Sequence, residues 1–135
     1  MGLFGTSAEI LVDINLILQY ATLILLLVGY VKRKTFKNHG YAMMVVLVIT
    51  VGTTVLVMAP RLLATFAVYG PFIFVHSVIG ILSMLLGALF SFRFIVAIQN
   101  EKPLLCGTKN MMRLAFILWV GPIISGTLMY FTLYV

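Results

Sequence analysis

The sequence predicts an all-α integral membrane protein, a four-helix bundle whose helices cross the bilayer up, down, up and down. Of its 135 residues, 63% are hydrophobic and only 9% are charged. A soluble domain carries roughly 25% charged residues, so the charges are too few to cover a water-exposed surface. Four long apolar runs with short connections therefore predict a single transmembrane domain over residues 1–135.

Local signals bound the four spans. Thr6 followed by Glu9 matches a capping box and predicts a helix start near Ser7. Pro60 cannot donate a helical hydrogen bond, so the second span is expected to end there. Each run has at least ~20 mostly apolar residues, enough for a ~30 Å hydrocarbon core. The expected spans are residues 7–31, 38–58, 72–98 and 111–135.

The basic residues predict the orientation of these spans. Eight of the nine Lys and Arg residues lie in or beside the first and third connections, which leaves Arg61 alone on the other side. These eight are Lys32, Arg33, Lys34, Lys37, Arg93, Lys102, Lys109 and Arg113. By the positive-inside rule, that side is cytoplasmic and both termini lie outside the plasma membrane. Aromatic residues such as Tyr130 are expected at the membrane interfaces.

The second connection, residues 59–71, is apolar rather than polar. A segment of this composition predicts a short helix that lies in the membrane interface or against a partner. No connection is long enough for a soluble domain. Cys106 is the single cysteine, so an intramolecular disulfide is excluded.

Few polar residues within the spans could carry chemistry. Asp13 on the first span, Arg61 near the second connection, and His76 and Met58 are expected at a similar depth on the outer side. A carboxylate beside a histidine and a thioether could bind copper. The alternative, which we favour, is a structural pair of Asp13 with Arg61 or with His76. His39 is expected at the opposite leaflet, since ~28 Å of helix separates it from the outer end of its span; the two histidines should not share one haem.

Small residues recur at helical spacing on the last two spans. In lipid, such positions let helices approach closely. They are equally compatible with packing inside the bundle and with a partner interface. The positions are Ser83, Gly87 and Ser91 on the third span, and Gly121 and Ser125 on the fourth.

Three stretches resemble the domain-of-unknown-function 420 family of small four-helix membrane proteins. They are Gly29-Tyr30 with Asn38-His39-Gly40 after the basic turn, the run Phe-Val-His-Ser-Val-Ile-Gly at 74–80, and Met112-Arg113-Leu114 leading through Trp119 to the tyrosine-containing end. The family includes a bacterial factor needed to mature haem-copper cytochrome oxidase. The resemblance places family histidines on His39 and His76. A further family histidine before the last helix has no counterpart, because residues 107–113 read Gly-Thr-Lys-Asn-Met-Met-Arg.

The expected function is that of a non-catalytic accessory subunit or assembly factor. Its partners would be other membrane subunits of a copper or haem oxidoreductase, of the respiratory or monooxygenase type, together with the lipid bilayer. No enzyme activity, cofactor or nucleic-acid partner is expected. Two alternatives stay open: a haem- or copper-binding electron-transfer protein, and a small transporter or channel that would use Asp13 and Gln19.

Overall fold

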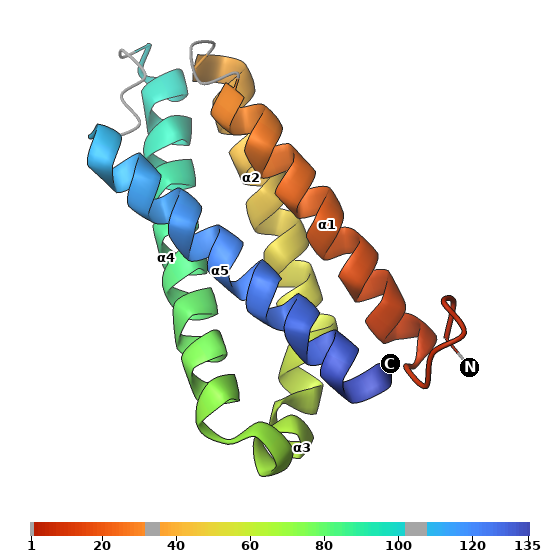
Figure 1. Cartoon of the computed structure of the whole chain (residues 1–135). Coiled ribbons are helices and arrows are strands. Elements are labelled where there is room, and N and C mark those ends of the chain that lie inside the picture. Colours follow the sequence, from red (N-terminus) through yellow and green to blue (C-terminus); the bar gives the residue numbers. More distant parts are fainter. Residues whose placement is uncertain (1, 32–35, 102–107) are drawn as a thin grey trace.

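The computed structural model describes residues 2–31, 36–101 and 108–135, and within them every regular element is a helix (Figure 1). Four helices are long and apolar enough to cross a membrane. The basic residues at 32–34 and 102, and Cys106, lie outside the described residues. The elements are α1 (Ile10–Val31), α2 (Phe36–Thr53), a π-helical turn η1 (Thr54–Met58), α3 (Ala59–Tyr69), α4 (Pro71–Gln99) and α5 (Lys109–Tyr134).

The N-terminal segment before α1 is not the helix start that the Thr6–Glu9 pattern predicts. Helix α1 begins at Ile10, and the residues before it form turns and bends. The amides of Val12 and Asp13 both bond to the carbonyl of Glu9. The Thr6 hydroxyl lies instead 3.1 Å from the hydroxyl of Tyr130 on α5. A tertiary contact has therefore replaced the local cap.

The chain stays helical through Pro60, where the sequence predicted an end. Pro60 has no N–H for the carbonyl four residues before it, and its ring would crowd that carbonyl. The π-helical turn η1 widens the helix just ahead of this point, and the amide of Ala59 bonds to the carbonyl of Thr54 five residues back. The expected short helix in segment 59–71 is present as α3. Gly70, with φ +43°, ends it, and Pro71 begins α4.

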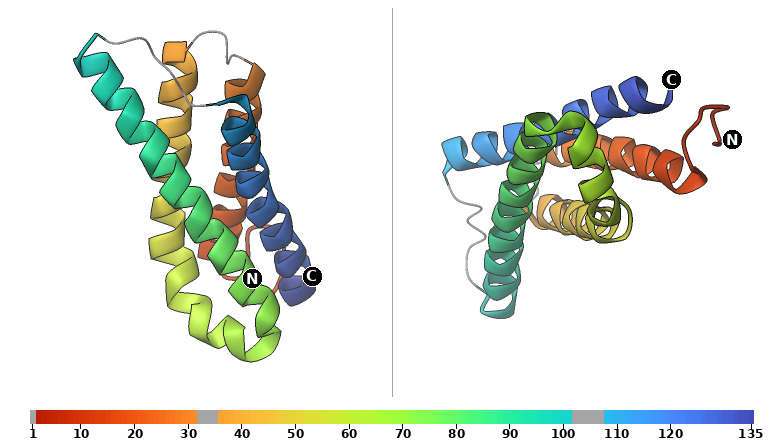
Figure 2. Two further views of the ribbon diagram at one scale, coloured as in Figure 1. Left: turned by 90° about the vertical axis from the view of Figure 1, so that its left-hand side faces the viewer. Right: turned by 90° about the horizontal axis from the view of Figure 1, so that it is seen from below.

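Helices α1 and α2 pack side by side, as do α4 and α5, and α2 also contacts α4 while α1 contacts α5 (Figures 1 and 2). The N-terminal segment lies beside the end of α5, because the Ser7 amide and hydroxyl both bond to the Tyr134 carbonyl. The buried core is small. Its central cluster consists of Leu26, Val46, Trp119 and Ile123, one or two from each of α1, α2 and α5.

Most large apolar side chains point away from this core. Val48 is 70% exposed on α2, Phe92 is 65% exposed on α4 and Ile117 is 65% exposed on α5. A soluble monomer rarely exposes contiguous apolar surface on this scale. The outward faces thus agree with helices that are solvated by lipid or by other membrane helices.

The glycine at position 87 lets α4 and α5 approach each other. A β-carbon placed on Gly87 would lie 2.8 Å from Cζ2 of Trp119 and 3.2 Å from Cδ1 of Leu47. Gly121 on α5 differs, because a β-carbon there would meet no atom of the part of the chain that the structure describes within 4 Å, its own helix backbone aside. Of the two glycines singled out from the sequence, Gly87 packs closely against another helix and Gly121 does not.

Replacing Gly87 by alanine should therefore destabilise the isolated bundle by about 1–3 kcal/mol, since the added methyl group would lie too close to the ring of the buried Trp119. Gly121→Ala is the matched control. It should be neutral or stabilise by up to ~1 kcal/mol, because alanine is the better helix former. Unfolding of the purified chain in detergent measures both changes, and equal effects of the two substitutions would contradict the assigned packing.

Candidate functional site

The ionisable residues expected to form one outer group are divided among separate contacts. Arg61 on α3 forms an ion pair with Glu9, just before α1. The Glu9 side chain is 76% exposed, so the pair sits at the surface, where an ion pair contributes little to stability. The carboxylate beside Arg61 is thus Glu9, rather than the expected Asp13.

Asp13 is fully buried and joins α1 to α5 through Tyr130. The Tyr130 hydroxyl donates its proton to Oδ1 of Asp13 at 2.6 Å. It therefore accepts a hydrogen bond from the Thr6 hydroxyl. Gly2 lies against Oδ2 of Asp13, so the N-terminal segment covers the carboxyl group. Oδ2 has no hydrogen-bond partner among the described residues. Tyr130 is 6% exposed and forms the α1–α5 contact.

His76 on α4 bonds to Ser125 on α5, with 2.8 Å between Nδ1 and Oγ. The Ser125 hydroxyl donates its own proton to the Pro122 carbonyl at 3.2 Å, so the proton between the two side chains belongs to the imidazole. Gly126 leaves room for the ring, because a β-carbon there would lie 3.4 Å from Cε1 of His76. His76 therefore fixes the register of α4 against α5.

The copper candidates do not form a ligand set. The sulfur of Met58 lies 3.9 Å from the Thr54 hydroxyl, within the π-helical turn. No group of three or more His, Cys, Asp or Glu side chains that could hold a metal ion occurs among the described residues. The structure thus places Asp13, Met58 and His76 in three different contacts.

His39 occupies the other end of the bundle. Its Nδ1 donates to the Gly29 carbonyl at 2.8 Å, near the end of α1, where helical carbonyls lack amide partners. Gly40 lies against the ring of Phe94 on α4. From position 76 to position 94 the axis of α4 rises by ~27 Å, at ~1.5 Å per residue. The two imidazoles are thus a whole helix apart, and one iron could not bind both.

Ser83 joins α4 to α5 at the point where Pro122 interrupts the helical hydrogen bonds. Pro122 has no N–H, so the carbonyl of Leu118 loses its partner four residues ahead. The Ser83 hydroxyl donates to this carbonyl at 2.6 Å and also lies 2.8 Å from the Ile79 carbonyl of its own helix. Ser83 is only 2% exposed, and α5 continues unbroken from Lys109 to Tyr134.

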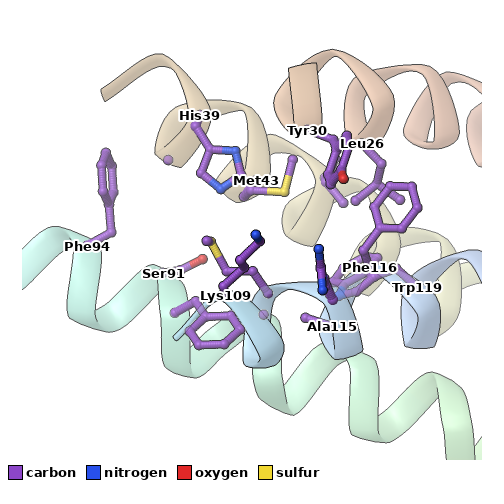
Figure 3. Close-up of a pocket in the computed structure, with 16 residues that line it drawn as sticks. Leu26, Tyr30, His39, Met43, Ser91, Phe94, Lys109, Ala115, Phe116 and Trp119 are labelled. Atoms are coloured by element: carbon purple, nitrogen blue, oxygen red, sulfur yellow. The ribbon is translucent and has the colours of Figure 1, made fainter. Parts of the chain in front are cut away.

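A cavity of about 110 Å³ opens between α1, α2, α4 and α5 at the His39 end (Figure 3). His39 and Met43 of α2 and Lys109 of α5 face the same space in Figure 3. Most of the lining is apolar or aromatic. The lining residues are Leu26, Tyr30, His39, Gly40, Met43, Val46, Gly87, Phe90, Ser91, Phe94, Lys109, Met112, Arg113, Ala115, Phe116 and Trp119.

Two cations make the cavity electrically asymmetric. Lys109 and Arg113 lie four residues apart in the first turns of α5, so they share one helix face. The ion pair of Arg61 with Glu9 is the one salt bridge among the described residues, and it lies at the other end of the bundle. The cavity can therefore take a ligand with an apolar part and a negative charge.

The sequence singles out several residues that line this cavity, but it does not predict that they lie together. From the sequence, Lys109 and Arg113 are topology signals, His39 is the counterpart of a family histidine, and Ser91 is a small residue at helical spacing. Their common feature is proximity to one end of a span. Three of the small residues have separate roles in the structure: Ser91 lines the cavity, Ser125 bonds to His76, and Gly121 is exposed.

Comparison with protein-family models, curated proteins and solved structures gives no significant match for this chain. The resemblance of the three stretches to the domain-of-unknown-function 420 family therefore stays a prediction.

The Ser83–Leu118 bond gives a double-mutant test of how α4 docks on α5. Ser83→Ala should cost about 0.6–2 kcal/mol of stability, because it leaves the Leu118 carbonyl without its partner. In a Pro122→Ala background the cost should be much smaller, since the new amide at position 122 can bond to that carbonyl. Unfolding of the four purified proteins in detergent measures the coupling. Equal costs in both backgrounds would show that the Ser83 hydrogen bond does not replace the one that the Leu118 carbonyl loses at Pro122.

Proposed function

We propose that this chain is a non-catalytic accessory subunit or assembly factor of a larger membrane-bound copper or haem oxidoreductase, of the terminal oxidase or membrane monooxygenase type. The oxidoreductase part of the proposal rests on the family resemblance. The accessory part rests on how the side chains are used. Asp13, Ser83, Ser125 and both histidines make contacts between helices or with helix ends, which favours a scaffold over a reaction centre.

In this proposal the four long helices cross the plasma membrane up, down, up and down, with both termini outside. The contacts of Ser7 with Tyr134 and of Glu9 with Arg61 support one shared end for the two termini and α3. His39 and Lys109 gather at the other end. The second end holds the excess of basic residues, which favours the cytoplasm.

An outward glycine on α2 is the observation that carries the subunit role. Apart from its own helix backbone, a β-carbon on Gly52 would meet no atom of the described residues within 4 Å. Val48 and Leu56, one turn before and after, are 70% and 71% exposed, so all three lie along one outward face. A helix-interior glycine costs about 1 kcal/mol relative to alanine. No contact among the described residues requires a glycine at this position. A neighbouring helix that packs closely against α2 would require it.

Native purification of the tagged chain from its own membranes tests this proposal. We expect stoichiometric recovery of larger membrane subunits, identified by mass spectrometry. Gly52→Leu should lower that recovery by about tenfold, since it overpacks the contact by more than ~1.4 kcal/mol. Ala88→Leu adds similar bulk to an exposed position of α4 and is the matched control. Recovery of the wild type as a lone monomer would contradict the proposal.

Cysteine labelling tests the orientation independently of any partner. In intact cells, a membrane-impermeant maleimide should label Leu3→Cys in a Cys106→Ser background, because Leu3 is 57% exposed on the proposed outer side. The wild-type Cys106, on the proposed cytoplasmic side, should react only after the membrane is opened. The reverse pattern would invert the topology.

A further inference from the structure

We propose that the cavity at the His39 end binds one anionic phospholipid, with an acyl-chain segment among the aromatic side chains and the phosphate on Lys109 and Arg113. The inference needs the helices to span a bilayer, but it needs no partner subunit. It thus stands or falls separately from the proposed accessory role.

The walls of the cavity fit a hydrocarbon segment. Leu26, Phe90, Phe116 and Trp119 supply apolar surface from three helices. Its volume of about 110 Å³ is below the roughly 150 Å³ of an apolar cavity that accepts benzene. A few methylene groups fit such a space, whereas a rigid macrocycle such as haem does not.

The charges at the cavity fit a phosphate. Lys109 and Arg113 repel each other on one helix face, and an anion between them would offset the repulsion. Lys109 is the first residue of α5 and Arg113 lies one turn further on. The helix dipole favours negative charge at this N-terminus. The Thr108 side chain accepts from Met111 there, which leaves the amides of the first helical residues for a ligand.

The chain itself offers little negative charge to neutralise this end. Its three acidic residues are Glu9, Asp13 and Glu101. Glu9 and Asp13 are engaged at the far end, with Arg61 and Tyr130. Glu101 follows α4 at the same end as the cavity, but it is exposed and does not line the cavity. Basic pockets between transmembrane helices at the membrane–water boundary recruit anionic headgroups, so an anionic lipid can supply the negative charge that the cavity lining lacks.

Copper is the rival occupant, since His39 and Met43 lie one turn apart and both line the cavity. Imidazole and thioether are suitable copper ligands. The ammonium of Lys109 and the guanidinium of Arg113, however, line the same space, and they would repel a metal cation. An anionic ligand satisfies the charges that a copper ion would oppose.

Trp119 makes the binding directly measurable, because it is the single tryptophan of the chain and is 7% exposed. Phospholipids with brominated acyl chains quench tryptophan on contact, and lipid around the outside of the bundle should reach Trp119 poorly. The purified full chain in neutral detergent is titrated with brominated phosphatidylglycerol and, separately, with brominated phosphatidylcholine. The anionic lipid should reach half-quenching at a mole fraction at least about fivefold lower, the contribution expected of one basic residue.

Matched variants assign the preference to the two cations. Lys109→Gln with Arg113→Gln should raise the half-quenching point of the anionic lipid to that of the zwitterionic one. Arg93→Gln removes a charge from an exposed position near the same end of α4 and should leave the preference intact. The Trp119 emission maximum before lipid is added reports whether each variant keeps its fold. If the double variant unfolds, each single substitution should still lower the preference several-fold.

Four results would overturn the proposal. One is equal quenching of the wild type by both lipids, and another is a preference that survives in the folded double variant. The third is competition by millimolar inorganic phosphate as effective as that by unbrominated phosphatidylglycerol, which would assign the site to a free anion. Copper bound with the loss of lipid quenching would likewise assign the cavity to the metal.

Discussion

The structure depends on one constraint: within a bilayer, every polar group of the backbone must find its partner inside the protein. Two prolines, Pro60 and Pro122, interrupt the helical hydrogen bonds, and the structure compensates for each in a different way. Ahead of Pro60 the helix widens into a π-helical turn. At Pro122 the α-helix continues without a π-helical turn. Ser83 on the neighbouring helix donates to the Leu118 carbonyl, which Pro122 leaves without an amide partner. His39 does the same for the Gly29 carbonyl near the end of α1. These repairs are also the contacts that join the helices.

The buried side chains follow the same rule. Asp13 is held by Tyr130, and His76 by Ser125, each across a helix boundary. Because lipid supplies no hydrophobic force between helices, such bonds and close glycine contacts decide how the bundle assembles. Gly87 admits Trp119, and together these contacts leave the outward faces apolar. Those faces can be covered by lipid or by another membrane protein without the loss of a hydrogen bond.

The two ends of the bundle differ in charge and in packing. At the end with the chain termini, Glu9 and Asp13 have partners, and the N-terminal segment covers the buried carboxyl group. At the other end, cations line an incompletely filled space between four helices. One end is therefore closed by the chain itself, whereas the other is suited to a ligand from outside it. The proposed accessory role draws on the outward faces, and the proposed lipid site draws on this second end.

The sequence by itself determined that the chain has four long apolar helices, a short helix between the second and third, and an excess of basic residues beside two connections. Hydrophobicity and breaker residues act locally, so they can be read without the fold. Only the tertiary structure decided that the helix continues past Pro60, that Thr6 meets Tyr130 instead of capping α1, and that Asp13, Arg61 and His76 have separate partners. Those outcomes depend on the rotation and register of each helix against its neighbours. A helix that is apolar on all sides leaves its rotation and register undetermined by the sequence, because no polar face shows which side turns away from the neighbouring helices.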